Sequence, residues 1–327
     1  MKKYSLGIDI GGTKCAVLLG NSCIPQNSDD TFILEKRTFL TEPKKGLNHT
    51  LSRLYETIDG LIEEHRILPE EVVGIGVSCG GPLDHVKGVI LNPPNLYGWN
   101  EVPIVSLLYN RYRIPSFLQN DADASALAEW RFGAARGCHN VVFLTFGTGM
   151  GAGLILDDKL YCGTNNMAGE VGHIRLEQNG PVGYGKAGSF EGFCSGGGIA
   201  QIARNKVVEY MQRGVYPPFC PDLSHLDEMD AKNIAEAATA GDPVALEIYK
   251  ICGENLGRGL SVIVDILNPE IIVLGSIFER NSELIWPHAK RILEKEALPQ
   301  SLRACKVVPA ALGDSIGDYA ALSVAFS

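Results

Sequence analysis

Short apolar runs separated by glycine turns recur along the chain, and stretches of helical periodicity lie between them. Strands are predicted where about four to eight mostly apolar residues stand between turn residues. The runs of this kind are Tyr4–Ile10, Cys15–Leu19, Thr31–Leu40, Val72–Ser78, Ser116–Gln119, Val141–Phe146, Leu154–Leu156 and Ile271–Leu274. Helices are predicted where apolar residues recur every three or four positions. These stretches are Leu47–Arg66, Val105–Tyr112, Ala122–Phe132, a segment beginning at Pro243, and Ile316–Phe326.

The clearest helix start lies at Asp242 and Pro243. Aspartate is a preferred N-cap residue, and proline at the first helical position loses no hydrogen bond. The helix that follows carries an apolar stripe, which we expect to face the core. Its members are Leu246, Tyr249, Leu256, Leu260 and Ile263.

Two strand–turn–strand units resemble each other, although about 140 residues separate them. The first is Gly7-Ile8-Asp9-Ile10-Gly11-Gly12-Thr13-Lys14, and the second is Thr145-Phe146-Gly147-Thr148-Gly149-Met150-Gly151. Two halves that each begin with such a hairpin predict a duplicated α/β architecture of two domains, with the ligand in the cleft between them. We place one domain at residues 1–120 and 313–327, and the other at residues 121–312.

The glycine turns allow more than one interpretation. A dinucleotide-binding fingerprint requires a helix directly after the turn, whereas Ala152–Leu156 continues as a strand, and no GxxxxGK[ST] phosphate loop exists. Each tip is therefore either a tight hairpin or a site where backbone N–H groups approach a phosphate. Two tips in equivalent places favour the phosphate role. Asp9, beside the first tip, either caps a turn or holds Mg²⁺ through water.

Charge and composition narrow the class of partner. The 327 residues include 29 Lys and Arg against 38 Asp and Glu, a net charge of −9. This acidic balance argues against a nucleic acid or an anionic membrane as the main partner. With 45% hydrophobic residues, the chain can bury a sizeable core.

Cysteine usage and apolar run lengths indicate a reduced, cytoplasmic protein. The nine cysteines are odd in number and contain no CxxC pair, which fits neither a disulfide framework nor a zinc clamp. The longest apolar candidate, Leu260–Leu274, is broken by Asp265, Asn268 and Glu270, so no membrane span is predicted. The start Met1-Lys2-Lys3 imitates a signal peptide, but Asp9 interrupts what would be its apolar core.

Several strings together make the chain resemble the ROK family of bacterial sugar kinases. They are Asp9-Ile10-Gly11-Gly12-Thr13-Lys14, Gly80-Gly81-Pro82-Leu83-Asp84, Pro94-Asn95-Leu96, Asn120-Asp121-Ala122, Gly147-Thr148-Gly149-Met150-Gly151, Gly169-Glu170-Val171-Gly172-His173, and Asn268-Pro269-Glu270-Ile271-Ile272-Val273-Leu274-Gly275. The resemblance extends from about Leu6 to Ala325. It implies an α/β protein with the two-domain actin-like ATPase fold, of hexokinase type and ribonuclease H-like. It also implies a homodimer that transfers the γ-phosphoryl group of ATP, with Mg²⁺, to a hexose hydroxyl, usually on carbon 6.

The resemblance also implies roles for individual residues. Asp121 would be the general base, and Asp123 is a nearby alternative that the motif does not select. The sugar ligands would be Gly81, Asn95, Asn120, Asp121, Glu170, His173 and Glu191. The residues around ATP would be Asp9, Gly11, Gly12, Thr13, Lys14, Gly147, Thr148, Gly149, Gly151 and Gly275, with Asp9 holding Mg²⁺ through water. Taken alone, Asn120 is also a typical helix N-cap, and His173 a structural histidine.

One segment departs from the family pattern. Most members carry a CxCGxxGCxE string, whose cysteines bind structural zinc together with the loop histidine. The matching stretch here is Val182–Glu191, in which Val182, Tyr184 and Ser189 stand where the cysteines would be. We therefore expect no zinc site, and we expect Tyr184, Phe190 and Phe193 to pack the loop instead.

Two other functions compete with a glucokinase-like enzyme. The family also contains sugar-sensing transcriptional regulators, which carry a helix-turn-helix domain before the first glycine turn. Only eight residues precede Asp9, too few for such a module. A sugar-binding protein without catalysis is the third possibility, and the presence of both Asp9 and Asp121 argues against it.

Overall fold

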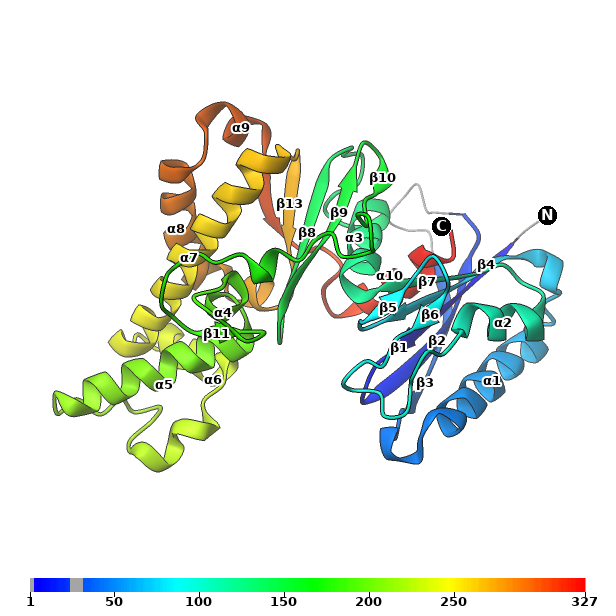
Figure 1. Cartoon of the computed structure of the whole chain (residues 1–327), viewed down its shortest axis with the longest axis horizontal. Helices are drawn as coiled ribbons and strands as arrows, with labels where there is room; N and C mark the ends of the chain where they lie inside the picture. The colour runs from blue at the N-terminus through cyan, green and yellow to red at the C-terminus, as the bar shows by residue number, and fades with distance from the viewer. Residues whose placement is uncertain (1–2, 24–31, 327) are drawn as a thin grey trace. The chain divides into compact units, whose positions relative to one another are not determined.

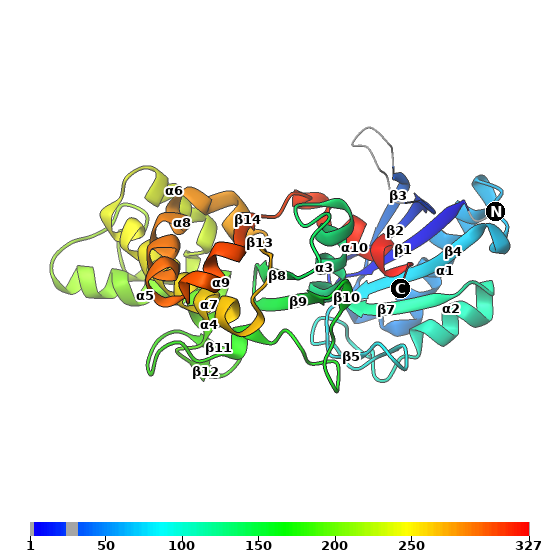
Figure 2. The same ribbon diagram turned by 90° about the horizontal axis from the view of Figure 1, so that it is seen from above.

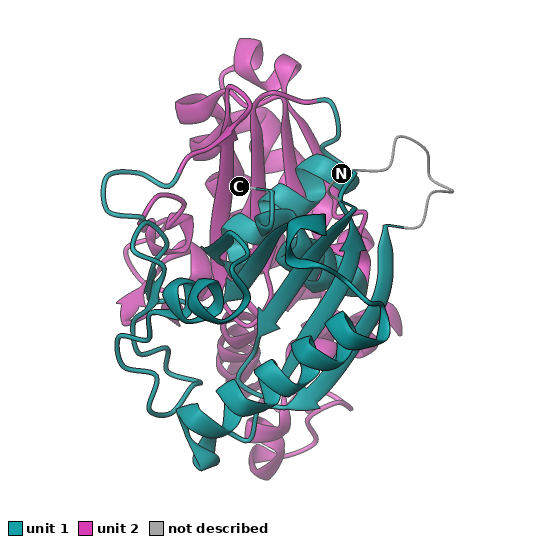
Figure 3. Cartoon of the chain, turned by 90° about the vertical axis from the view of Figure 1, so that its right-hand side faces the viewer, with its two compact units in different colours: residues 1–137, 162–166, 314–327 teal, residues 138–161, 167–313 magenta. Residues whose placement is uncertain are grey.

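The chain forms two compact units, each with its own sheet. Figure 1 shows the computed structural model, which describes residues 3–23 and 32–326. One unit comprises residues 1–137, 162–166 and 314–327, and the other comprises residues 138–161 and 167–313 (Figure 3). The predicted strand Thr31–Leu40 begins just outside the described residues, and its described part is a strand from Ile33.

The sheet of the first unit mixes antiparallel and parallel strands. The antiparallel part is a meander of three strands, and the other two lie parallel to the first of them. Because the ends of parallel strands meet at one edge, Ile10, Cys79 and Asn120 lie in register there. The strand order is β3 (Ile33–Leu40), β2 (Lys14–Asn21), β1 (Tyr4–Ile10), β4 (Val72–Cys79) and β7 (Ser116–Asn120).

Helices cover both faces of this sheet (Figures 1 and 2). Helices α1 (Leu47–Glu64) and α2 (Ile104–Tyr112) join Leu6 and Ile8 of β1 in one apolar core. The opposite face carries α3 (Asp121–Phe132) and α10 (Ile316–Val324). Helix α10 lies directly on the strands, because a Cβ placed on Gly76 would come 2.3 Å from the Ala321 carbonyl oxygen.

The boundary between the units differs from the predicted one at residue 120. The first unit continues to Gly137, because α3 packs on α10 and the Arg131 guanidinium donates to the Ser323 carbonyl oxygen. Asp121, at the start of α3, therefore belongs to the same unit as Asp9.

The second unit repeats the strand order of the first. Its three antiparallel strands are again followed by two parallel ones. The predicted duplication of an α/β fold is confirmed at this level. The order is β10 (Lys159–Leu160), β9 (Met150–Leu156), β8 (Val141–Phe146), β13 (Ile271–Leu274) and β14 (Lys306–Pro309). The helices are α4 (Phe190–Phe193), α5 (Gly196–Gln212), α6 (Ala231–Thr239), α7 (Pro243–Leu267), α8 (Ile277–Glu296) and α9 (Pro299–Ala304).

Helix α7 is the longest helix that the described residues form, and it begins as predicted. The Asp242 carboxylate accepts the backbone N–H groups of Val244 and Ala245, both at 2.9 Å. Four residues of the predicted stripe are buried. The prediction is wrong for Leu246, because 41% of its surface is exposed. Val244 and Ala245, directly before it, are buried in the core, so Leu246 lies on the exposed side of a first turn that already packs. Further along, Gly257 lets α8 approach to backbone contact, since a Cβ there would lie 2.4 Å from the Ala289 carbonyl oxygen.

The two glycine-rich segments contain only short elements. The first includes β5 (Leu83–Asp84) and β6 (Val89–Ile90), and Trp99 anchors it with 1% of its surface exposed. The second includes η3 (Val171–His173), β11 (Val182–Gly183) and β12 (Lys186–Ala187). The remaining 3₁₀ helices among the described residues are η1 (Pro43–Lys45), η2 (Pro69–Glu71), η4 (Leu223–Glu228) and η5 (Gly313–Ser315).

Two global expectations can be checked against the described residues. No helix among them is long and apolar enough to cross a membrane. All nine cysteines lie in the described ranges, and each is a free thiol.

Candidate functional site

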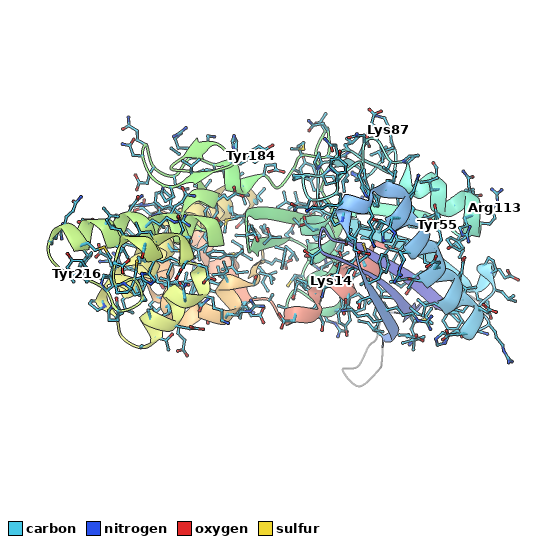
Figure 4. All side chains as sticks on the ribbon, turned by 90° about the horizontal axis from the view of Figure 1, so that it is seen from below. Lys14, Tyr55, Lys87, Arg113, Tyr184 and Tyr216 are labelled. Atoms are coloured by element: carbon cyan, nitrogen blue, oxygen red, sulfur yellow. The ribbon has the colours of Figure 1, made fainter. Side chains whose placement is uncertain are left out.

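The first glycine turn joins β1 to β2 at the edge where the parallel strands end. The N–H of Gly11 donates to the Lys14 carbonyl oxygen (3.1 Å), and the Thr41 hydroxyl donates to the Gly11 carbonyl oxygen (2.6 Å). Thr13 and Lys14 are exposed at the tip, where Figure 4 labels Lys14. The turn is thus fixed from behind, and its exposed side remains available to a ligand.

Gly12 brings this turn against a predicted sugar ligand. A Cβ on Gly12 would lie 2.7 Å from the Cβ of Asn95, closer than real side chains approach. Asn95 is exposed, and its neighbour Leu96 is buried and holds the loop in place. Gly81 is also exposed, with open space where a side chain would be.

Asp9 lies beside the turn in surroundings that disfavour the negative charge of its carboxyl. Burial, followed by the negative charges of Asp318 and Asp121, raises the pKa of the Asp9 carboxyl to about 6. Gly317 leaves room for it, since a Cβ there would come 3.4 Å from Asp9 Oδ2. A cation beside this group of carboxylates would relieve their repulsion.

Asn120 and Asp121 lie at the start of α3, and the two nearby aspartates, Asp121 and Asp123, differ in burial and in hydrogen bonding. Asn120 Oδ1 accepts the Asp123 N–H (2.8 Å), so Asn120 is the helix N-cap. Asp123 is 3% exposed and accepts hydrogen bonds from Asn120 Nδ2 (3.0 Å) and from the Cys162 thiol (3.7 Å). Asp121 is exposed, and the surrounding protein raises the pKa of its carboxyl by desolvation. Of the two aspartates, Asp121 alone is accessible to a substrate.

The second glycine turn joins β8 to β9 and is hydrogen-bonded to the start of α5. The N–H of Gly147 donates to the Gly149 carbonyl oxygen (3.1 Å), and the N–H of Gly196 donates to the Gly147 carbonyl oxygen (2.8 Å). Nothing lies within 4 Å of a Cβ placed on Gly147. Behind the turn, the Thr145 hydroxyl accepts the Gly151 N–H (2.9 Å). Thr148 is exposed at the tip.

A cavity of about 1020 Å³ opens beside this turn, within the second unit. It includes Gly147 and Thr148, the first turn of α5, one side of α6 and the start of α8. The backbone is unusual where α8 begins, because Ser276 adopts φ 49° and α8 is kinked at Asn281. The lining residues are Gly147, Thr148, Gly196, Gly197, Ala200, Asp230, Ala231, Lys232, Ala235, Glu236, Thr239, Ser276, Ile277, Arg280 and Asn281. The predicted Gly275 is buried directly before Ser276 and donates its N–H to the Leu144 carbonyl oxygen (3.0 Å).

Glu191 lies against the second glycine turn, as Asn95 lies against the first. Its Oε2 accepts the Met150 N–H at 3.0 Å, and a Cβ on Gly149 would come 2.8 Å from the same oxygen. The turn η3 is adjacent, because a Cβ on Gly172 would lie 3.2 Å from the Glu191 Cβ. Glu170 and His173, at the two ends of η3, are both exposed. The structure therefore brings Glu170, His173 and Glu191 together around the second turn.

The predicted site residues thus form one group in each unit. The sequence prediction missed most of the cavity, notably the starts of α5 and α8 and the side of α6 that carries Lys232 and Glu236. One signal was available, because Ser195 precedes three consecutive glycines at a helix start. A helix start of this kind can present an N–H group to an anion, and Gly197 is the candidate here, because Gly196 and Gly198 donate to Gly147 and Ser195.

The residues of Val182–Glu191 do not fit zinc. Within residues 3–23 and 32–326, no three His, Cys, Asp or Glu side chains gather into a group that could hold a metal ion. Phe190 and Phe193 are buried, as expected. Tyr184 is not, because 91% of it is exposed, so the expectation that it packs the loop is wrong (Figure 4). The tip of the β11–β12 hairpin carries it outward.

Comparison with known proteins identifies the family. The ROK family model matches residues 5–326. The chain belongs to the ROK family. Both glucokinases and xylose repressors have sequences similar to this chain. The glucokinase of Thermotoga maritima is 31% identical, over 98% of this chain and 96% of its own. The xylose repressor of Caldicellulosiruptor bescii is 27% identical, over 94% of this chain and 74% of its own.

A solved structure of a ROK glucokinase supports the same architecture. The Streptomyces griseus enzyme, in complex with glucose and AMPPNP, has a TM-score of 0.72 and 26% identity, over 98% of each chain. The fold expected from the sequence, a two-domain α/β structure of the actin-like sugar kinases, is confirmed.

Proposed function

We propose that this chain transfers the γ-phosphoryl group of ATP to a hydroxyl of a hexose, the 6-OH of glucose or of a close relative. The observation that carries the proposal is that each glycine turn touches a predicted sugar ligand, Gly12 at Asn95 and Gly149 at Glu191. Phosphoryl transfer depends on positioning, since acceptor oxygen and phosphate must lie in line and in contact. A turn that receives phosphate must then lie beside the groups that hold the sugar.

Asp121 is the proposed general base. It is the exposed aspartate of its helix, and its desolvated carboxyl is a stronger proton acceptor than one in open water. In the proposed reaction it accepts the proton of the attacking hydroxyl while the oxygen bonds to phosphorus. The exposed carboxylate of Glu170 and the carboxylate of Glu191 would accept hydrogen bonds from other sugar hydroxyls.

The residues present fit ATP, and they fit a Mg²⁺ ion held through water beside the phosphates, although no cluster of direct protein ligands lies among the described residues. The cavity beside the second turn is large enough for a nucleotide, and α5 begins there with Gly197, whose N–H group suits phosphate. Asp9 would hold Mg²⁺ through water, and the neighbouring Asp318 and Asp121 add to its negative field. When bound, Mg²⁺ neutralises charge on the phosphates.

A sugar-responsive repressor is the second candidate, favoured by the similarity to xylose repressors. A repressor needs sugar binding but no general base. Measurement of ADP release with glucose, mannose, fructose, allose, N-acetylglucosamine, N-acetylmannosamine and β-glucosides separates the two. Sugar-dependent ADP release supports the kinase, whereas sugar binding without ADP release supports the repressor. The homodimer and the cytoplasmic location remain predictions.

A matched pair of variants tests the nucleotide cavity. Thr239 lines the cavity, and its hydroxyl donates to the Ala235 carbonyl oxygen one turn back (2.9 Å). Thr57 makes the same bond to Arg53 in α1 of the other unit (2.7 Å). Thr239→Trp should fill part of the cavity and raise the KM for ATP at least about tenfold, while Thr57→Trp leaves it unchanged. Equal KM values for ATP in both variants would place the nucleotide elsewhere.

A further inference from the structure

The segment that binds zinc in most ROK proteins is built differently here. Its three cysteine positions hold Val182, Tyr184 and Ser189, and His173 stands at the position of the fourth ligand. We propose that direct contacts at these same positions replace the metal and hold Glu191 and His173 in place, with Gln201 and Ser189 as positioning residues. The kinetic part of this inference rests on the proposed function.

The first contact fixes the beginning of the β11–β12 hairpin to α5. Gln201 of α5 uses both ends of its side-chain amide on one residue. Its Oε1 accepts the Val182 N–H, and its Nε2 donates to the Val182 carbonyl oxygen, both at 2.9 Å. Two bonds to the backbone of one residue define its position and orientation together, as a metal ligand would.

The second contact joins the hairpin to the turn that carries Glu191. The Ser189 hydroxyl is buried, donates to the Gly183 carbonyl oxygen (3.4 Å) and accepts the Gly192 N–H (3.1 Å). The hairpin lies flat on this turn, since a Cβ on Gly183 would come 2.8 Å from the Glu191 Cβ. A shift of the hairpin must therefore move Glu191.

The third contact fastens η3 to the tip of the hairpin. Tyr184 and Gly185 occupy the two central positions with φ 44° and 75°, the left-handed pair typical of a type I′ turn. This conformation is costly for tyrosine, so its surroundings must maintain it. The Tyr184 ring meets the His173 ring edge-on, with 6.3 Å between centroids. On the next strand, Lys186 Nζ donates to the His173 carbonyl oxygen (2.7 Å).

The position of Glu191 has a direct reporter. Its Oε2 accepts the N–H of Met150, at the second glycine turn. Loosening of the hairpin should weaken this bond and speed exchange of the Met150 amide hydrogen with solvent. The same loosening should misplace a sugar ligand and leave the cavity for the nucleotide unchanged.

Three variants of α5 test the proposal. Gln201→Met keeps the side-chain length but removes both bonds to Val182, and Gln201→Glu keeps an acceptor for the Val182 N–H. Gln212→Met makes the same change at the exposed end of the helix and is the control. We expect Gln201→Met to raise the KM for sugar about three- to tenfold, the effect of one or two hydrogen bonds, with the KM for ATP unchanged. Gln201→Glu should lie between Gln201→Met and the unaltered protein.

Amide exchange and metal analysis complete the test. In Gln201→Met, the amides of Val182 and Met150 should exchange faster, while Gln212→Met matches the unaltered protein. Elemental analysis should find far less than one zinc per chain, and added zinc should not restore Gln201→Met. Stoichiometric zinc, or unchanged exchange and unchanged sugar KM in Gln201→Met, would overturn the inference. If the unaltered protein phosphorylates no sugar, the proposed function fails, and amide exchange still decides how the segment is held.

Discussion

Replacing Gly149 by alanine should displace Glu191, whereas the same replacement two residues earlier should not. The methyl group of Gly149→Ala would lie 2.8 Å from Glu191 Oε2, and that of Gly147→Ala would meet no atom within 4 Å. Neither glycine has a φ in the left-handed region, so alanine fits the backbone at both positions. The two variants thus differ in what their methyl groups meet.

The size of the displacement follows from contact distances. An ordinary contact begins near 3.4 Å, so the Glu191 carboxylate must retreat by roughly half an ångström. The hydrogen bond from the Met150 N–H, 3.0 Å long, would then exceed a normal length. Hydrogen bonds to a charged group contribute about 1.5–3 kcal/mol. If Glu191 binds the sugar, Gly149→Ala should weaken sugar binding about ten- to a hundredfold.

Steady-state kinetics with both substrates varied provides the assay. Gly149→Ala should raise the KM for sugar by that factor. Gly147→Ala should leave the KM for sugar unchanged and raise the KM for ATP, because its methyl group occupies the space that a phosphate would enter. Melting temperatures of both variants should stay within a few degrees of the unaltered protein, since neither change creates a cavity or breaks the core.

Two results would refute this reasoning. An unchanged KM for sugar in Gly149→Ala would show that Glu191 does not bind sugar, or that it yields without loss. An unchanged KM for ATP in Gly147→Ala would show that no phosphate approaches this turn, which would then be only a tight hairpin.

Two further predictions concern the carboxylates of the first unit. Asp121→Asn removes the proposed base but keeps its size, so kcat should fall about 10²- to 10⁴-fold while sugar binding, followed by calorimetry, persists; a near-normal kcat would exclude Asp121 as the base. Burial and the charges of Asp318 and Asp121 raise the pKa of Asp9 to about 6, so without Mg²⁺ the folded state binds this proton more tightly than the unfolded state does. Asp9 should therefore contribute an increase in the free energy of unfolding as the pH falls from about 7 to about 4, and Asp9→Asn should lack this contribution and be more stable than the unaltered protein above pH 7 by up to about 3 kcal/mol. Urea unfolding in EDTA measures the pH dependence of stability and the stability difference between the two proteins. If Asp9→Asn keeps the pH dependence of the unaltered protein, the raised pKa does not belong to Asp9.

The sheets could be predicted because their signals are local. An apolar run closed by glycines specifies a strand and its end within about ten residues, and the repeat of this pattern after Asp9 and after Thr145 revealed the duplication. Helix α7 was equally clear, because Asp242 and Pro243 mark its start. The periodicity failed at Leu246, since spacing alone does not show which side of the first turn packs, and the residues buried there are Val244 and Ala245.

The contacts of the site could not be predicted, because they join distant segments. Glu191 follows Gly149 by 42 positions, and nothing local to either indicates that the two touch. The cavity likewise needs the starts of α5 and α8 and one side of α6, which only the packed second unit brings together. Tyr184 was expected to fill space because it is aromatic, but a two-residue turn points its side chain outward.

The glycines of both turns are required for space and not for backbone freedom. None of Gly11, Gly12, Gly147 and Gly149 adopts a left-handed φ, so the backbone conformation of these turns does not itself require glycine. At Gly12 and Gly149 the space is taken by a predicted sugar ligand, and at Gly147 it is open. In an isolated hairpin, a position such as Gly147, with room for a side chain and no left-handed φ, would not need to be glycine. The open space at Gly147 is therefore explained if a ligand that the chain does not itself supply approaches the backbone there, and a phosphate group has the size and the charge to do so.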